Sequence, residues 1–151
     1  MMTSTVSIRE ATAADLPAIL DLYAQPGVDD GERLPLDAAH AIFARMATYP
    51  FYKLYVAHQH DAPIIATYTL LVMENLAHMG TPSAVVEQVM VSPDQQGAGL
   101  GRLMMAHAID IARAHGCYKL ALSSNVKRDA AHAFYDRLGF ERHGYSFRIM
   151  L

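Results

Sequence analysis

Three alternate glycines at positions 97, 99 and 101 follow a short apolar run and open a segment with helical periodicity. The apolar run ends at Pro93, which lacks the N–H that a strand ladder needs and therefore ends a strand. After the glycines, apolar residues fall at helical spacing: Leu100, Leu103, Met104, Ala108 and Ile111. The glycines are therefore predicted to lie at a helix N-terminus, where unpaired backbone N–H groups and the helix dipole favour an anion.

The spacing of this loop separates it from two other phosphate-binding loops. A nucleotide P-loop needs a Gly-Lys-Ser/Thr ending, and no lysine occurs here. A dinucleotide fingerprint needs a glycine at its sixth position, which is Arg102 counted from Gly97 and Met104 counted from Gly99. The segment Gln96-Gly-Ala-Gly-Leu-Gly101 instead resembles the Q/R-x-x-G-x-G/A loop of GNAT superfamily N-acetyltransferases, which holds the pyrophosphate of acetyl-CoA. Taken alone, the pattern also fits a glycine-rich turn without a ligand.

A second motif lies about thirty residues further along the chain. Leu122-Ser-Ser-Asn-Val-Lys-Arg128 leads into a segment with the pattern A-x-x-F-Y-x-x-x-G-F, from Ala131 to Phe140. This resembles the second GNAT signature, in which a polar strand end and a helix complete the cofactor groove. The resemblance extends from an opening strand at Ile8 to a closing strand at 143–147. It implies a GNAT fold across nearly the whole chain.

The resemblance also implies which residues bind acetyl-CoA. In the family, the strand before the glycine loop splays from its neighbour and its exposed backbone pairs with pantetheine, while the loop and the second signature hold the rest of the cofactor. The residues that correspond here are Val89, Met90, Val91, Gln96, Gly97, Ala98, Gly99, Leu100, Gly101, Arg102, Asn125, Arg128, Ala131 and Tyr135.

Tyr135 is the predicted general acid. By resemblance, its hydroxyl lies near the sulfur of CoA and protonates the departing thiolate, a type of proton transfer typically worth about 10²- to 10⁴-fold in rate. Judged by spacing alone, Tyr135 also fits a core aromatic residue with its hydroxyl at the surface.

Glu87 is the predicted general base, because it lies on the strand that meets the thioester. Strand alternation is expected to put residues 87, 89 and 91 on one face. A carboxylate on an otherwise apolar strand is expected to face the cleft or an ordered water. A structural hydrogen-bonding role for Glu87 is the alternative.

The pattern of apolar, turn and capping residues predicts an α/β chain. The resembled fold is a mixed, mostly antiparallel central sheet, splayed between its fourth and fifth strands and flanked by about four helices. Strands are expected at 5–11, 53–58, 63–74, 83–92, 118–123 and, in two pieces, 140–151, and helices at 13–24, 37–49, 99–115 and 129–138. The Pro- and Gly-containing segment 25–37 is expected to border the acceptor site.

Length and composition fit one small enzyme. The 151 residues, 52% of them hydrophobic, match a single acetyltransferase domain over 1–151. With neither a long apolar span nor a signal-peptide pattern, and with Cys117 as the only cysteine, we expect a cytoplasmic protein without a membrane partner. A pI of about 6.2 argues against nucleic-acid binding. None of the histidines has zinc-site spacing, so no metal is expected.

The sequence thus predicts an acetyl-CoA-dependent N-acetyltransferase that acts on a primary amine of a small molecule. A peptide or protein acceptor is one alternative, and a non-catalytic acyl-CoA-binding regulatory module is another. The apolar run from Tyr145 to Leu151 suits the interface of a homodimer, and its alternation equally suits an internal strand.

Overall fold

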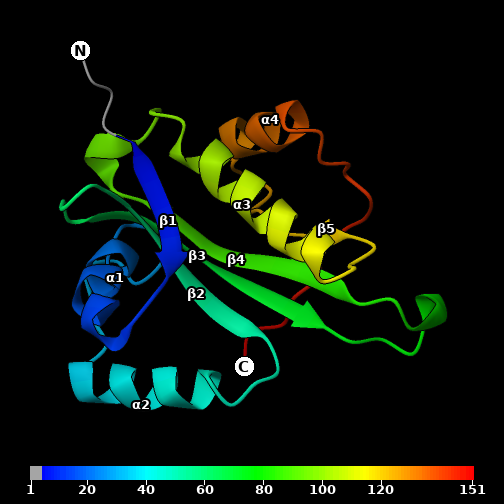
Figure 1. The fold of residues 1–151 in the computed structure, drawn as a ribbon. Coiled ribbons are helices and arrows are strands. Elements are labelled where there is room, and N and C mark those ends of the chain that lie inside the picture. The colour runs from blue at the N-terminus through cyan, green and yellow to red at the C-terminus, as the bar shows by residue number, and fades with distance from the viewer. Residues whose placement is uncertain (1–4) are drawn as a thin grey trace. The chain divides into compact units, whose positions relative to one another are not determined.

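The computed structural model of the protein describes residues 5–151 (Figure 1). This part of the chain forms two compact units, the first ending at Ala121 and the second running from Leu122 to Leu151. The first unit contains a five-stranded sheet with helices α1, α2 and α3, and the second contains helix α4.

The sheet positions the candidate site. Its strands are β1 (Val6–Glu10), β2 (Tyr52–Gln59), β3 (Ile64–Met73), β4 (Ser83–Val91) and β5 (Leu120–Ala121). They lie in chain order, with β1 to β4 antiparallel and β5 parallel to β4. The parallel pair requires a crossover, which the helix between β4 and β5 provides. This mixed, mostly antiparallel sheet confirms the predicted fold class.

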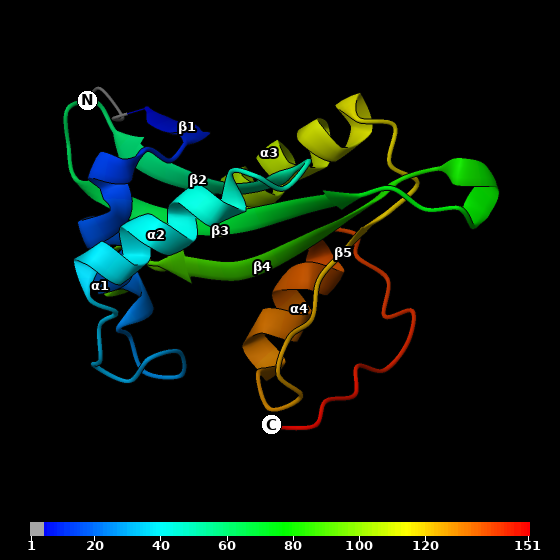
Figure 2. The same cartoon turned by 90° about the horizontal axis from the view of Figure 1, so that it is seen from below.

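Helices α1 (Leu16–Tyr23) and α3 (Leu100–Ala114) cover opposite faces of the sheet (Figures 1 and 2). Two neighbouring residues of β3 show this. Thr69 forms a side-chain hydrogen bond with Tyr23 of α1, whereas Tyr68 bonds to His107 of α3. Successive strand side chains point to opposite faces, so the two helices lie on different sides. Helix α2 (Leu36–Met46) contacts α1.

Each face of the sheet has its own apolar core. The core beneath α1 and α2 contains Ala11, Leu16, Ile19, Ala39, Leu54 and Val56. The core beneath α3 contains Tyr68, Leu70, Val86, Met104, Met105 and Ala108, all buried. The buried residues of both helices recur at three- to four-residue spacing, as expected for helices with one apolar face.

The sheet opens between β4 and β5, as predicted. Only Ala84 and Val85 of β4 pair with β5, opposite Leu120 and Ala121. From Val86 to Val91, β4 therefore has no strand partner on that side among residues 5–151. The strand expected at 118–123 is short because just two of its residues form the ladder.

In the second unit, α4 (Asp129–Arg137) forms close to its predicted position. The strands expected within 140–151 are absent, because no residue there pairs with a strand in the described structure. Their apolar side chains are exposed: Tyr145 by 91%, Phe147 by 89% and Ile149 by 84%. Alternating hydrophobicity yields a strand only when a neighbouring strand supplies hydrogen bonds and covers one face.

Candidate active site

A β-bulge interrupts β4 at the predicted base. Glu87 pairs with Thr69 and Met90 pairs with Thr67, so two steps along β3 correspond to three steps along β4. The extra residue lies between Glu87 and Met90. Within this bulge, Gln88 has a φ of 45°, which is unusual for a residue other than glycine. The prediction that 87, 89 and 91 share one face is therefore wrong. Glu87 instead shares its face with Met90, and Val91 lies on the other.

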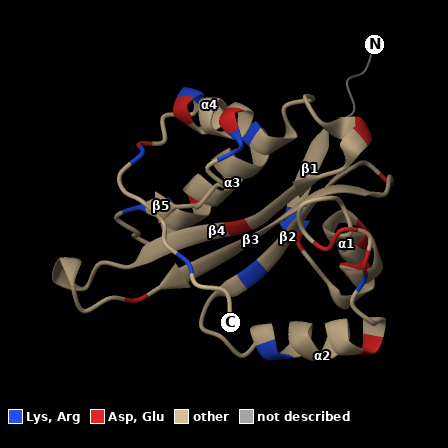
Figure 3. Ribbon diagram, turned by 180° about the vertical axis from the view of Figure 1, so that it is seen from behind, with Lys and Arg blue, Asp and Glu red and all other residues tan. Residues whose placement is uncertain are grey.

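Glu87 is exposed on the face that α1 covers and is the one acidic residue of β4 (Figure 3). Aromatic hydroxyl groups lie near it. Burial raises the pKa of Tyr52, and the negative charge of Glu87 raises it further. Burial also raises the pKa of Tyr23 to about 12, against the opposing effect of its hydrogen bond with Thr69. Both phenols therefore stay protonated at neutral pH and are available as hydrogen-bond donors.

The backbone of β4 is accessible at the open edge of the sheet. The N–H of Ser92 donates to the carbonyl of Ile65 at 2.8 Å. Because backbone directions alternate along a strand, the N–H and C=O of Val91 point away from β3, toward the side where β5 has ended. The carbonyl of Val91 accepts hydrogen bonds from the Nε2 atoms of Gln25, at 3.0 Å, and Gln96, at 3.4 Å.

The glycine loop leads from this edge directly into α3. Gly97 and Gly99 have φ angles of 85° and 84°, which residues with side chains rarely adopt. Gly99 is the N-cap, and the N–H of Leu103 is already bonded to its carbonyl at 3.2 Å. A Cβ atom at either glycine would meet no other atom within 4 Å, so the space outside the loop is open. The loop thus presents first-turn N–H groups to an approaching anion.

Residues 16–140 match the model of the acetyltransferase (GNAT) family. This protein belongs to that family. The match covers most of the chain, including β4, the glycine loop and α4. The predicted family and its acetyltransferase class are therefore confirmed.

Similar proteins come from several organisms. Glucosamine 6-phosphate N-acetyltransferase of Trypanosoma brucei brucei is 33% identical over 62% of this chain, and the match spans 62% of that enzyme. Aminoglycoside N(6')-acetyltransferase type 1 of Stenotrophomonas maltophilia is 32% identical over 93% of this chain and 90% of its own length. Aminoalkylphosphonate N-acetyltransferase of Salmonella typhimurium is 34% identical over 41% of this chain and 40% of its own length.

A solved structure shows the same fold over nearly the full length. A protein assigned as an acetyltransferase from Agrobacterium tumefaciens strain C58 has a TM-score of 0.87 and 35% identity, with 96% of this chain and 99% of that chain covered. The GNAT fold inferred from the two signatures therefore extends well beyond them.

The second unit carries the other predicted cofactor residues of this GNAT enzyme. The carbonyl of Asn125 accepts bonds from the Arg128 N–H at 3.0 Å and from His132 Nε2 at 2.8 Å, which fixes the start of α4. Ala131 and Tyr135 follow on α4. The Ser124 Oγ is buried without a hydrogen-bond partner among the described residues, which fits a segment that receives a polar ligand.

Tyr135 is held by aromatic neighbours within its own unit. Its ring contacts Phe134 and Phe140 edge-on, with centroid distances of 5.2 and 5.6 Å. Burial raises the pKa of the Tyr135 phenol, and the positive charge of Arg128 partly opposes this. The group therefore carries its proton at neutral pH, as a general acid must.

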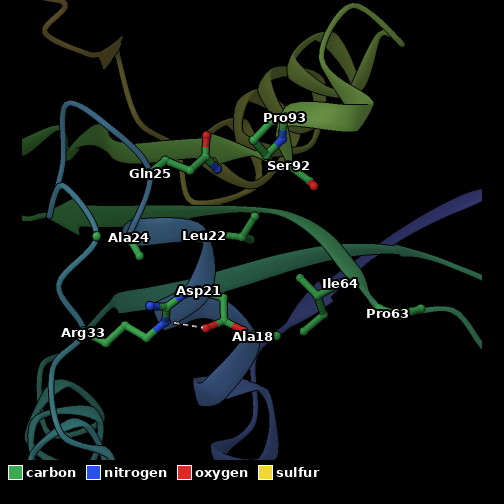
Figure 4. A pocket seen from close by; sticks show the side chains of 11 residues that line it. Ala18, Asp21, Leu22, Ala24, Gln25, Arg33, Pro63, Ile64, Ser92 and Pro93 are labelled. Atoms are coloured by element: carbon green, nitrogen blue, oxygen red, sulfur yellow. Dashed lines mark hydrogen bonds and ion pairs between the residues drawn. The ribbon is translucent and has the colours of Figure 1, made fainter.

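The structure also reveals groups that the sequence did not single out. A cavity of about 430 Å³ lies in the first unit, between α1, the segment after it and the ends of β3 and β4 (Figure 4). Its lining includes Asp21, Gln25, Arg33, Ile64 and Ser92. Gln25 and Arg33 belong to segment 25–37, which was expected to border the acceptor site, whereas Tyr23 and Tyr52 belonged to no motif. The only signal for these two tyrosines was their position at or near the ends of predicted elements.

Within residues 5–151, no group of three or more His, Cys, Asp or Glu side chains is arranged to hold a metal ion. None of the described helices is long and apolar enough to cross a membrane.

Proposed function

We propose that this acetyltransferase moves the acetyl group of acetyl-CoA directly to a primary amine of a small molecule. The proposal rests on one continuous segment, which comprises β4, the glycine loop and the start of α3. The open edge of β4 runs without interruption into the glycine loop and the N-terminus of α3. An extended amide-containing arm followed by a pyrophosphate needs such a strand edge followed by an anion cradle.

The proposed contacts follow this division. Val89, Met90 and Val91 offer backbone groups to pantetheine, and the loop from Gln96 to Arg102 holds the pyrophosphate. Asn125, Arg128, Ala131 and Tyr135 are the residues of the second unit that we propose to bind the cofactor. The bulge at Gln88 takes an N–H out of the regular ladder. Such an N–H is suited to polarise the thioester carbonyl as charge develops on its oxygen.

The proposed reaction needs three proton movements. Glu87 accepts a proton from the ammonium group of the acceptor, directly or through water, and the free amine then forms the new C–N bond. As the C–S bond breaks, Tyr135 donates its proton to the departing thiolate. The second proton that the nitrogen loses on becoming an amide returns to the Tyr135 phenolate through solvent. Holding amine and thioester together supplies much of the rate, since effective molarities reach about 10⁵ to 10⁸ M.

Two relatives support a small acceptor. The names of the trypanosomal and Stenotrophomonas enzymes specify an amino sugar phosphate and an aminoglycoside, which are both small amines. We also propose that residues 1–151 act as one acetyltransferase domain in the cytoplasm, and that Tyr145 to Leu151 contribute to a homodimer.

The test is acetyl-CoA turnover across a panel of amines, aminophosphonates, aminoglycosides and peptides, read by mass spectrometry. We expect at least one acetylated small amine. Tyr135→Phe should lower kcat by about 10²-fold or more while acetyl-CoA still binds, and Glu87→Gln should also lower kcat by about 10²-fold or more. Tyr118→Phe, which changes a partly exposed tyrosine outside the proposed contacts, serves as the control.

The alternatives predict different outcomes. Acetylation of peptides alone would replace the small-molecule acceptor with a protein one. Tight acetyl-CoA binding without any product, in small amines and peptides alike, would favour a binding module. Unchanged turnover by Tyr135→Phe across the pH range would remove this phenol from the mechanism.

A further inference from the structure

Two glutamine side chains converge on one backbone carbonyl at the end of β4. The acceptor is the C=O of Val91. Gln25 donates to it at 3.0 Å from the segment after α1, and Gln96 donates at 3.4 Å from the glycine loop. Three parts of the first unit therefore meet at one atom: the segment expected to border the acceptor site, the strand proposed to pair with pantetheine, and the loop proposed to hold pyrophosphate.

The segment after α1 is folded mainly on itself. The N–H of Asp29 bonds to the Tyr23 carbonyl at 3.0 Å, that of Gly31 to the Ala24 carbonyl at 2.7 Å, and that of Gly27 to Asp30 Oδ1 at 2.7 Å. Arg33 reaches back to Asp21 at 2.7 Å, but this pair is more than half exposed and is therefore worth little. Among the hydrogen bonds of the described residues, the Gln25 bond is the one that joins this segment to β4.

The same contact forms part of the cavity wall. Gln25, Ser92 and Pro93 lie along the edge of the 430 Å³ cavity next to Val91, while Gly31 and Arg33 line it from the segment after α1 (Figure 4). A cavity of this size suits a small ligand. The bond from the Gln25 amide to Val91 lies on this wall and joins segment 25–33 to β4.

We propose that Gln25 is a positioning residue for the amine acceptor, whereas Gln96, on the same carbonyl, serves acetyl-CoA. The inference rests on the proposed function. Pantetheine pairing with the edge of β4 fixes Val91, and the Gln25 bond extends that order to residues 26–33. The amine then meets a formed cavity wall. Without the Gln25 donor, the Ser92 bond still holds Val91 in the sheet, but segment 26–33 loses its hydrogen bond to β4.

The test compares three variants with the unmodified protein. Gln25→Glu keeps the length of the side chain but removes its donors, and Gln96→Ala removes the second donor. Gln95→Ala is the matched control, because the Gln95 side chain forms none of the hydrogen bonds found in residues 5–151. The measurements are the Kd of acetyl-CoA by calorimetry, hydrogen–deuterium exchange of residues 26–33 with and without CoA, and the acceptor KM and kcat with an amine from the panel.

We expect CoA to slow amide exchange in residues 26–33 of the unmodified protein and of Gln95→Ala, but not of Gln25→Glu. Gln25→Glu should raise the acceptor KM about two- to tenfold, the range for one lost hydrogen bond, with kcat at saturation and the Kd of acetyl-CoA within about twofold. Gln96→Ala should show the reverse, a weaker acetyl-CoA complex with the acceptor KM unchanged at saturating cofactor.

Two results would overturn the inference, and they are distinguishable. If acetyl-CoA binds normally but Gln25→Glu leaves both the exchange of 26–33 and the acceptor KM unchanged, Gln25 has no positioning role and the proposed function stands. If the unmodified protein binds neither acetyl-CoA nor CoA, the proposed function fails, and the inference fails with it.

Discussion

At the scale of single residues, one partly buried ion pair fixes the junction between β1 and α1. The guanidinium of Arg9 donates to both carboxylate oxygens of Asp15, at 2.7 and 2.9 Å. The same carboxylate accepts the N–H of Thr12 at 2.7 Å, as in a capping box. These bonds lower the pKa of Asp15 to about 2. The group therefore stabilises the fold above its unfolded pKa, and this contribution is lost as pH falls from about 4 through 2.

Replacing Asp15 should test this linkage. We expect Asp15→Asn to lower the free energy of unfolding by about 1–2 kcal/mol at pH 7, because the exposed side of Arg9 weakens the pair, and the difference should shrink toward pH 2. Urea denaturation at several pH values measures both effects. Asp136→Asn, which breaks the exposed pair with Arg142 at 2.7 Å, is the control and should change little. A pH-independent difference for Asp15→Asn would contradict the assignment.

A second residue-scale feature is the buried contact between Tyr68 and His107. The Tyr68 hydroxyl lies 2.6 Å from His107 Nδ1, and Tyr55 stacks on Tyr68 with a centroid distance of 5.2 Å. Burial lowers the pKa of His107, with an opposing effect from the charge of Asp110. The folded state therefore favours the neutral imidazole of His107. Its contribution is complete above the unfolded pKa of about 6.5 and declines as pH falls through the folded pKa.

An NMR titration of the His107 ring tests this assignment. We expect the ring to titrate with a midpoint below 6.5. In Asp110→Asn the midpoint should fall further, because the carboxylate that favours the imidazolium is gone. A midpoint at or above 6.5, or a rise in Asp110→Asn, would mean that burial does not dominate at this site.

At the scale of elements, the bulge and the glycine loop decide how β4 serves the site. Residue spacing correctly placed the strand, the turn and α3. It did not show the extra residue at Gln88, since a bulge arises from pairing with β3 and leaves no period of its own. Leu103, one of the apolar residues at helical spacing, is 46% exposed on α3, while Met105, which is outside that set, is buried. Packing against the sheet, and not the helix period alone, determines which side of α3 faces inward.

Two glycines allow a matched test of the loop. Gly99 at the N-terminus of α3 and Gly116 after its C-terminus have φ angles of 84° and 73°, and a Cβ at either would meet nothing within 4 Å. We therefore expect Gly99→Val and Gly116→Val to lose similar stability, about 1–2 kcal/mol, from the left-handed backbone alone. Only Gly99→Val should weaken acetyl-CoA binding in calorimetry. Equal affinity in both variants would reject the pyrophosphate assignment.

At the scale of the whole molecule, residues 145–151 expose several large apolar side chains. Tyr145, Phe147 and Ile149 are 84–91% exposed, and Leu151 is also exposed. Contiguous exposed apolar groups of this kind often mark an interaction site. Their alternation puts Tyr145, Phe147, Ile149 and Leu151 on one side of an extended backbone, which suits addition to a second copy of the chain.

Sedimentation over a range of concentrations tests this homodimer. We expect the unmodified protein to dimerise and the combined Tyr145→Ser, Phe147→Ser, Ile149→Ser variant to sediment as a monomer. Leu76→Ser with Met79→Ser is the control, because those side chains are 101% and 99% exposed but belong to the loop between β3 and β4. A monomeric unmodified protein, or a variant that dimerises equally well, would reject this interface.

The sequence by itself determined the family, the order of the elements down to α4, and the segments that carry the glycine loop and the candidate acid and base. These follow from local rules: helical spacing, turn residues and motif spacing act over neighbouring positions. Gly99 could be found this way, whereas the roles of Glu87 and Tyr135 came from the resemblance to the GNAT signatures. Only the tertiary structure decided which face Glu87 lies on, that β5 pairs over two residues, and that Gln25 reaches Val91. Those features depend on strand pairing and on contacts between residues far apart in the chain, and no local periodicity encodes them.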